Sequence, residues 1–362
     1  MLKSRDCKEI PIMTIFELLL YICLLFSVFK KTRNSNILIV FLLCIMVGIA
    51  AFRSIDIGVD TIHYYEDYLF AVSMHSLSDK QAGELLFAFM TYVFRNYLNY
   101  DWYMLFWYSC IIFSAGFVII KSSKNKFLSL FLFIACCFYT NSLNVMRQFV
   151  SSFLMFIAMY EYTKENFNKY KIMLICVVCY FIHNSSLILW PLFFVKKMDM
   201  SKILQLSLVL GSFVLGFFLT RYLYVIFEIL STYAGRFGGY LLYEGDGERN
   251  FISNLGVNIM FIATLFIASP NTIKTVYFKA YFISMVLFNI VGSMYYLTRI
   301  TDLYAIAQII CLPTAIYEYK NRTGKYIYIL LLISYALSRF YIKGLYPFLP
   351  YDFRDNINLF SF

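Results

Sequence analysis

The stretch RSIDIGVDTIHYYEDY, residues 53–68, concentrates side chains capable of chemistry in a chain that is otherwise largely apolar. A carboxylate such as Asp60 would accept a proton from a hydroxyl group. Arg53 would bind phosphate or carboxylate through two parallel hydrogen bonds. Gly58 gives the backbone freedom to turn between Arg53 and Asp60. The alternative is a solvated loop in which Asp60 caps a short helix.

Further polar groups interrupt apolar runs later in the chain. They are NVMRQ at 144–148, FIHNSS at 181–186, YAGRFGGY at 233–240 and RITD at 299–302. An ionisable side chain at the edge of an apolar run is costly and therefore suggests function, although Arg147 could instead extend to the membrane interface. His183 is a candidate proton acceptor because histidine is the residue type suited to proton transfer near neutral pH, with a histidine satisfied by a backbone carbonyl as the alternative.

The elements that must position these residues are transmembrane helices. Of the 362 residues, 61% are hydrophobic and the mean hydropathy is +0.69, which excludes an ordinary soluble fold. Apolar runs of about 20 residues indicate an all-α, polytopic membrane protein. We predict twelve spans, at 11–29, 36–52, 102–120, 127–143, 146–163, 171–184, 186–196, 203–222, 254–269, 277–294, 300–317 and 326–342.

Two regions of this pattern are unusual. The sixth and seventh spans are short, and we predict that they meet at a bend near His183–Ser186. Residues 82–98 are amphipathic and are expected to lie at the membrane surface or to re-enter it. The chain is thus expected to be a single membrane-embedded domain, 1–362, with a first outer loop at about 53–101 and a second at 223–253.

Lysine placement predicts the orientation. Fifteen lysines and two arginines, against four acids once Glu161 at the edge of the third loop is counted, lie in the loops 30–35, 121–126, 164–171, 196–202, 270–279 and 318–325. The two sides then carry net charges of +13 and −3, which together give the +10 of the chain. The positive-inside rule puts the lysine loops in the cytoplasm, with both termini and the 53–68 cluster outside. The positive charge is therefore a topological signal, and no nucleic-acid partner is expected.

Cysteine and acid spacing do not indicate a cofactor. The nine cysteines lie almost entirely in apolar runs, and the CxxC at Cys176 and Cys179 is expected to pack within a span. No metal ligand set is predicted and no cofactor is expected, with dependence on a divalent metal left open.

The outer side of the predicted topology gathers arginines, an aspartate, a glutamate and a histidine at one membrane–water boundary. The headgroup of a phosphate-bearing lipid would lie at this depth. Arginines would bind its phosphates while a carboxylate or imidazole deprotonates an incoming hydroxyl. This is the chemistry of a transferase with a lipid-linked donor.

Several motifs occur in an order that resembles a known family. They are Arg53 with Gly58-Val-Asp60-Thr61 and Tyr64, Gly83-Glu84-Leu-Leu-Phe87, Met146-Arg147-Gln148, His183-Asn184-Ser185-Ser186, Arg299, and Leu349-Pro350-Tyr351. The sequence resembles the EpsG/Wzy-type bacterial polysaccharide polymerases, which include O-antigen polymerases. The resemblance implies a membrane glycosyltransferase of GT-C-like helical architecture. Such an enzyme would transfer a glycan from undecaprenyl pyrophosphate to the non-reducing end of another lipid-linked repeat unit on the outer face of the bacterial inner membrane.

The resemblance also implies roles for individual residues. Arg147, Arg236 and Arg299 are candidates to bind the pyrophosphate. Asp60 is the first candidate for the general base and His183 the second, with Glu84 orienting either of them. The remaining substrate-binding candidates are Arg53, Gln148 and Tyr64, and Arg53 could instead pair with Asp56 or Asp60 to fix the loop.

Three other functions remain open from the sequence. A flippase for the lipid-linked oligosaccharide would also have many spans and buried charges. An O-antigen ligase would use the same donor with a different acceptor, and a membrane O-acyltransferase would modify a glycan without extending it. The expected partners are the lipid-linked donor and acceptor, the lipid bilayer, a chain-length regulator and a flippase.

Overall fold

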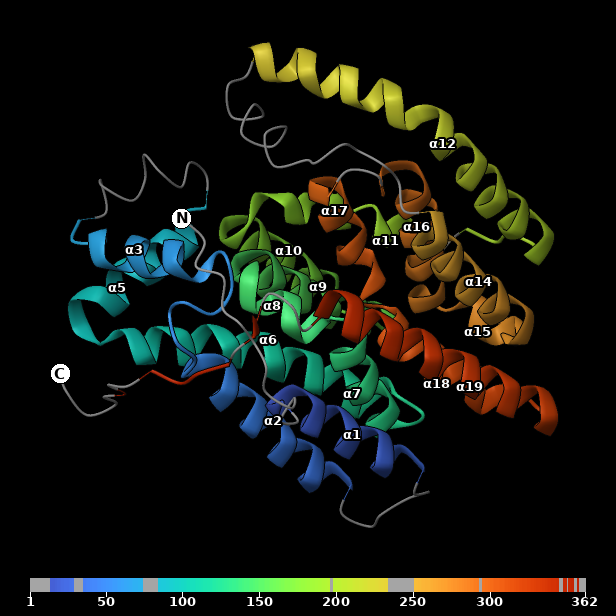
Figure 1. The fold of residues 1–362 in the computed structure, drawn as a ribbon, viewed down its shortest axis with the longest axis horizontal. Helices are drawn as coiled ribbons and strands as arrows, with labels where there is room; N and C mark the ends of the chain where they lie inside the picture. The colour runs from blue at the N-terminus through green and yellow to red at the C-terminus, as the bar shows by residue number, and fades with distance from the viewer. Residues whose placement is uncertain are drawn as a thin grey trace, which may run out of the picture.

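The fold is helical throughout the part of the chain that the structure describes. The structure is a computed structural model, and it describes residues 14–28, 35–73, 84–195, 198–233, 251–292, 295–344, 348–349, 351–354 and 357. Within these residues there are seventeen α-helices, two short helices of other types and one isolated β-bridge (Figure 1). The predicted all-α class is therefore confirmed.

The first half of the chain supplies the helices that carry most of the candidate residues. In chain order these are α1 (Ile15–Val28), α2 (Ser35–Ala51), α3 (Thr61–Phe70), α5 (Leu85–Tyr97), α6 (Tyr100–Ser122), α7 (Lys126–Ala135), α8 (Phe138–Asn144), α9 (Met146–Thr163), α10 (Lys169–Ile182), a 3₁₀ turn (Asn184–Leu189) and α11 (Leu192–Val195). The second half comprises α12 (Lys202–Tyr233), α14 (Phe251–Ile267), α15 (Pro270–Lys274), α16 (Val276–Val291), α17 (Tyr295–Ala305), α18 (Gln308–Glu318), α19 (Arg322–Arg339) and a π turn (Phe340–Gly344).

Each predicted apolar span coincides with a helix or with a pair of helices. Two of them are broken: α7 and α8 meet at 45°, and the end of α17 meets α18 at 41°. At the first break, Cys137 adopts the left-handed conformation with φ of 66°. The bend predicted near His183 is present, because α10 ends at Ile182 and a 3₁₀ turn follows.

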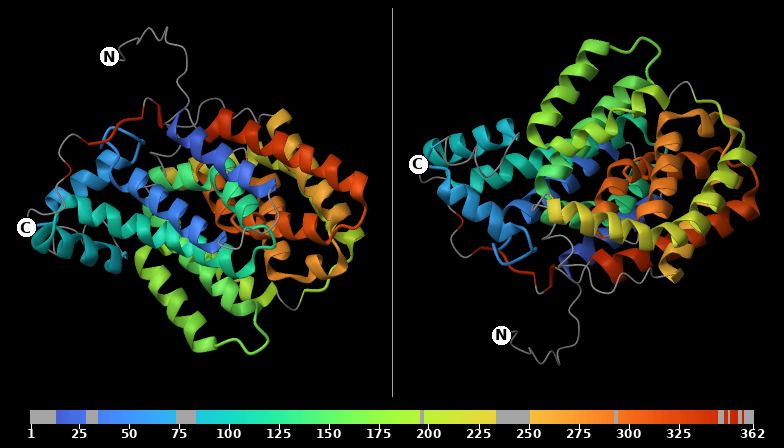
Figure 2. Two further views of the ribbon diagram at one scale, coloured as in Figure 1. Left: turned by 90° about the horizontal axis from the view of Figure 1, so that it is seen from below. Right: turned by 90° about the horizontal axis from the view of Figure 1, so that it is seen from above.

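Several of these helices have the length and composition of membrane spans. In the described residues, three helices meet both conditions alone, and five segments do if each bent pair is one span. α6 is central, with 61% of its apolar window buried, whereas the windows of α12 and α19 are only 22% buried. Figures 1 and 2 show α12 along the edge of the molecule. Large exposed apolar side chains on such an edge helix fit a lipid environment, and the protein is a multi-pass membrane protein.

One boundary differs from its prediction. The second outer loop was expected at 223–253, but α12 continues to Tyr233 and α14 begins at Phe251. The sequence RYLYVIFEILSTY keeps apolar residues three and four apart, so it continues the helical pattern beyond the length that a bilayer requires. The remainder of this loop lies outside the described residues.

Aromatic side chains attach α3 and α5 to the first turns of α6. The ring of Phe87 stacks on that of Trp107 at 4.9 Å, and Tyr68 contacts the rings of Tyr100 and Tyr103 at 5.2 and 5.5 Å. Offset and edge-to-face arrangements of this kind are favourable beyond the area that they bury. Figure 1 shows α3 and α5 together at one end of the molecule, which we call the Glu84 end.

The chain also closes on itself at the Glu84 end. Residues 351–354 pair with residues 52–54 after α2, through Ser54 N to Asp352 O (2.9 Å) and Arg354 N to Phe52 O (3.0 Å). The Arg354 guanidinium forms a 2.6 Å ion pair with Asp101 on α6. The segment that follows α2 is therefore fixed by contacts with residues that lie about 300 positions later in the sequence.

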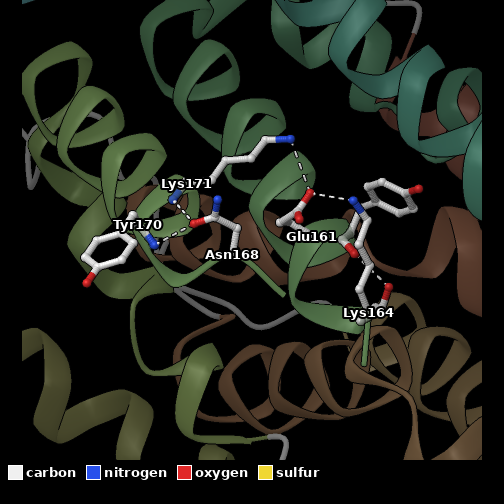
Figure 3. A network of polar contacts seen from close by, with 7 residues as sticks. Glu161, Lys164, Asn168, Tyr170 and Lys171 are labelled. Carbon is white, nitrogen blue, oxygen red and sulfur yellow. Dashed lines mark hydrogen bonds and ion pairs between the residues drawn. The ribbon is translucent and has the colours of Figure 1, made fainter. Parts of the chain in front are cut away.

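The opposite end is defined by lysine loops, and we call it the lysine end. There Glu161 Oε2, at the end of α9, accepts hydrogen bonds from Lys164 Nζ (2.8 Å) and Lys171 Nζ (3.2 Å), as Figure 3 shows. Asn168 Oδ1 caps α10 by accepting from the backbone N–H groups of Tyr170 and Lys171. These contacts fix the turn between two helices that pack along their length.

Candidate functional site

Three candidate residues from distant parts of the sequence meet at the Glu84 end. The Glu84 carboxylate receives a hydrogen bond from Arg147 Nη1 at Oε2 (2.8 Å), and its Oε1 lies 2.5 Å from His183 Nδ1. Glu84 immediately precedes α5, Arg147 is in the first turn of α9, and His183 ends α10. The sequence named all three residues, and the structure brings them together.

The three side chains of this group are only partly buried. The side chain of Glu84 is 11% exposed, while those of Arg147 and His183 are 30% and 24% exposed. His183 Nε2 has no hydrogen bond within the described part of the chain. Each oxygen of the Glu84 carboxylate thus has a hydrogen-bond partner, and both partners retain exposed surface that a substrate can reach.

The electrostatics of Glu84 favour the ionised carboxylate. Burial would raise its pKa, but the hydrogen bond from His183 and the positive charge of Arg147 outweigh burial and hold the pKa below its ordinary value. The carboxylate is therefore charged at neutral pH. A charged carboxylate on Nδ1 fixes the orientation of the imidazole.

Aromatic rings form one wall around Arg147. The guanidinium carbon lies 5.7 Å from the ring centre of Tyr64 and 5.5 Å from that of Phe87. Such cation–π contacts orient a guanidinium without using its hydrogen-bond donors. Burial raises the pKa of Tyr64 to about 12. The charge of Asp60 also raises this pKa, whereas the charge of Arg147 lowers it. The phenol therefore stays neutral.

Asp60 lies on the same side of the molecule but is not part of the hydrogen-bonded group. It directly precedes α3, at the N-cap position that the sequence predicted, yet its side chain makes no capping hydrogen bond. Its charge acts on Tyr64 and Tyr108. Its carboxylate is therefore near the site, without the orienting partner that His183 has.

Gln148 links α9 to α17. Its Nε2 donates to the backbone carbonyl of Arg299 at 2.8 Å, so the residue after Arg147 contacts the backbone of a second candidate arginine. The backbone of Arg299 is thereby placed beside the first turn of α9. The sequence grouped Gln148 with Arg299 as substrate-binding residues, and the structure gives Gln148 a positioning contact.

Arg53 has a different environment from Arg147. Its side chain is 1% exposed, and its guanidinium donates to Thr61 Oγ1 (3.0 Å), Tyr108 OH (2.8 Å) and backbone carbonyls that include Leu143 O (2.7 Å). The suggested pairing with Asp56 or Asp60 does not occur, because carbonyls and hydroxyls take its donors. Arg53 therefore connects the segment after α2 to α6 and α8, and no face of it is open to a ligand.

Gly58 and Asn144 fit the 53–60 segment against the end of α8. Gly58 has φ of +89°, and a Cβ there would lie 2.7 Å from Asn144 Oδ1. The same oxygen accepts from Val59 N at 2.9 Å. The glycine is thus required both for its backbone conformation and for its close approach, which confirms the backbone freedom expected at Gly58.

Other candidates contribute less. Arg236 lies outside the described residues. His63 and Glu66 form only an exposed contact of 3.4 Å on α3. Among the described residues, no three His, Cys, Asp or Glu side chains are grouped as metal ligands. Cys176 and Cys179 are buried free thiols within α10, as the packing interpretation predicts.

Two contributors were not recognised in the sequence. Tyr108 supports Arg53 from within an apolar run, and Asp101 holds Arg354 beside the ring of Tyr100. Neither residue belongs to a motif, and their partners are 55 or more residues away. The only sequence signal was that Arg354 is an arginine on the predicted outer side.

The fold and this site define a class, a multi-pass helical membrane protein with an arginine, a glutamate and a histidine joined at one end of its bundle. The sequence model of the EpsG family matches residues 36–353, so the chain belongs to the EpsG family. No curated protein and no solved structure showed a significant match. Membership of this family implies a role in exopolysaccharide biosynthesis at the membrane.

Proposed function

We propose that this protein is a polysaccharide polymerase, a membrane glycosyltransferase that joins repeat units carried on undecaprenyl pyrophosphate. Membership of the EpsG family supports the pathway. The contact of Glu84 with Arg147 and His183 is the observation that carries the proposal, because it combines an anion-binding side chain with an oriented base. The proposal includes twelve spans, a GT-C-like architecture and a Glu84 end that faces outward from the bacterial inner membrane.

In the proposed reaction the bond between the sugar's anomeric carbon and the diphosphate oxygen breaks. The acceptor hydroxyl oxygen bonds to that carbon, and its proton passes to the base. The lipid diphosphate leaves with the electron pair and gains negative charge. Arg147 stabilises that charge from its exposed edge, with Arg299 and Arg236 as further candidates.

The geometry favours His183 over Asp60 as the base. Glu84 holds Nδ1, so Nε2 is the nitrogen that receives a proton from the acceptor hydroxyl. Glu84 is a positioning residue in this scheme, because its two carboxylate oxygens already contact Arg147 and His183. Within the residues that the structure describes, Asp60 has no comparable partner, and it acts through the charge that it adds beside Tyr64.

The test is a reconstitution of the purified protein with lipid-linked repeat units, followed by gel separation of products. A polymerase gives a ladder of lengthening glycans. His183→Gln is expected to reduce the rate by about 10²- to 10⁴-fold, and Asp60→Asn by less than about tenfold. The reverse order of effects would assign the base to Asp60, and a wild-type protein that makes no ladder would overturn the polymerase proposal.

A flippase is the second candidate, because two segments of the chain are bent helix pairs. Discontinuous helices are common at the substrate sites of transporters. The same reconstitution separates the two functions: a flippase moves the lipid-linked repeat across the bilayer and leaves its length unchanged. A ligase is separated by its acceptor, since it would label a lipid other than undecaprenyl pyrophosphate.

A further inference from the structure

A second concave site lies at the lysine end. A cavity of about 390 Å³ is formed between α6, α9, α16 and α18, which is within the usual size range of small-molecule sites. Thr163, the last residue of α9, lines it, whereas Arg147 is in the first turn of the same helix. A helix of this length spans about 27 Å at 1.5 Å per residue, so the cavity is separate from the Glu84 site.

Positive charge converges on this cavity from two loops. Lys121 lies in the last turn of α6 and Lys124 follows that helix, while Lys274 ends α15, about 150 residues later. Within the described residues, none of these three ammonium groups forms an ion pair. The positive-inside rule accounts for lysines at this end of a bundle, but it does not require that they line one hollow.

The cavity lining contains little negative charge, and the one carboxylate present is already hydrogen-bonded. Glu318 is the one carboxylate among the lining residues, and it accepts hydrogen bonds from the hydroxyls of Ser269 and Thr272. Three lysines against one acid leave a net positive lining. Lys124 also lies over the ring of Tyr317 at 5.7 Å, so part of this charge is oriented by an aromatic neighbour.

The rest of the lining indicates what kind of anion fits. Val276, Ile310 and Cys311 contribute apolar surface, and the hydroxyls of Tyr277 and Ser122 bond to each other at 3.1 Å. A ligand here meets cationic and apolar groups together. Lysine supplies charge without the fixed fork of arginine, which suits a phosphate held in variable orientations.

We propose that this cavity binds a phosphate-bearing anion, supplied either by a phospholipid headgroup or by a small soluble phosphate compound. The site is independent of the polymerase proposal, because it shares no residue with the Glu84 site. Occupancy would tie the ends of α6, α9, α16 and α18 together at the lysine end.

The test measures thermal unfolding of the purified protein with two probes. The protein is placed in phosphatidylcholine nanodiscs, and either inorganic pyrophosphate is titrated or phosphatidylglycerol is included in the disc. All variants carry Arg147→Ala, so that binding at the Glu84 site does not contribute. The test variant adds Lys121→Gln, Lys124→Gln and Lys274→Gln. Its control adds Lys169→Gln, Lys320→Gln and Lys325→Gln, which make the same charge change at the same end without lining the cavity.

The parent and the control are expected to gain about 3 °C or more in Tm with at least one probe, and the test variant is expected to lose most of that gain. A response to phosphatidylglycerol alone identifies a lipid source, and a response to pyrophosphate alone identifies a soluble one. Equal responses in all three proteins, or none to either probe, would overturn the proposal. If the triple variant does not fold, Lys274→Gln alone should weaken pyrophosphate binding by about tenfold, and unchanged binding would count against the site.

Discussion

A carboxylate with two basic side chains as partners is present at each end of α9, and the two arrangements differ in how they are assembled. Glu161 meets Lys164 and Lys171, which are 3 and 10 residues away, across the turn that joins the end of α9 to the first turn of α10. Glu84 meets Arg147 and His183, which are 63 and 99 residues away. The first arrangement requires only a local turn, whereas the second requires three separate elements to be positioned together.

The partners also differ in exposure and type. The two lysine side chains are 42% and 50% exposed and can exchange this partner for water at little cost. The partners of Glu84 are more shielded, and one of them is an imidazole, a side chain type common in proton transfer. The Glu84 cluster joins side chains of different types that are distant in sequence and shielded from solvent, and such a cluster is costly to assemble. Its presence therefore suggests a role in chemistry. The lysine pair at Glu161 is explained by topology and turn formation.

The largest expected effect is at Arg147. Arg147→Ala should reduce polymer formation in the ladder assay by on the order of 10²-fold or more, because the charge on the leaving diphosphate loses its partner. Arg147→Lys should recover little of this loss, since an ammonium lacks the bidentate fork. Full activity in the lysine variant would show that charge alone matters there, and full activity in the alanine variant would remove Arg147 from the site.

Glu84→Gln is expected to have the next largest effect. The amide keeps the shape but cannot hold the imidazole and guanidinium as a charged acceptor, so we expect a loss of about 10- to 100-fold in the ladder assay. The matched control is Glu161→Gln, which makes the same change at the other end of α9 and should stay within about twofold. Similar losses in both variants would show that the two clusters do not differ in role.

The same variant makes a prediction about pH. The pKa of Glu84 is lower in the folded protein than its ordinary value of 4.5, so its ion pairs contribute to stability at pH values above that value. The contribution is lost as the pH falls through the lower, folded pKa. The difference in Tm between wild type and Glu84→Gln should therefore shrink as the pH falls below about 4.5. A difference that grows as the pH falls below 4.5 would contradict the depressed pKa.

A smaller effect, on stability alone, is expected from a pair of glycine substitutions. Gly58→Ala should destabilise the Glu84 end by about 1–3 kcal/mol, because φ is +89° and the new Cβ would contact Asn144. Gly211→Ala in α12, where a Cβ meets nothing within 4 Å, should stabilise its helix by about 0.5–1 kcal/mol. Thermal unfolding of the two variants should move in opposite directions, and a neutral Gly58→Ala would indicate that the 53–60 segment relaxes freely.

The sequence predicted the helices well because apolar length is an additive, local signal. It also predicted the bend at His183 and the glycine turn at Gly58. The breaks in the segments 127–143 and 300–317 were not predicted, since neither Cys137 nor the residues beside it are helix breakers by type. The continuation of α12 to Tyr233 was missed because a span of bilayer length was assumed to end there.

The candidate site was predictable as a set of residues but not as a set of contacts. Arg147, Glu84 and His183 are polar residues at the ends of apolar runs, and such positions are visible in a sequence. Which carboxylate meets which cation depends on how α5, α9 and α10 pack. For the same reason Arg53 and Arg147 looked alike in sequence, although only the structure shows that Tyr108 and nearby carbonyls take the donors of Arg53.

The smallest effect is expected at the lysine pair, and this expectation tests the comparison most directly. Lys164→Ala and Lys171→Ala each remove one partner of Glu161 and leave the other within 3.2 Å. Each should change the ladder rate by less than about twofold, because exposed pairs contribute little and this pair lies at the far end of α9. The double variant leaves a shielded carboxylate, 6% exposed, without a cation and should lower Tm more than the two single variants together. A loss of activity that follows this loss of Tm would reflect unfolding, whereas a loss at unchanged Tm would mean that the lysine end takes part in the reaction.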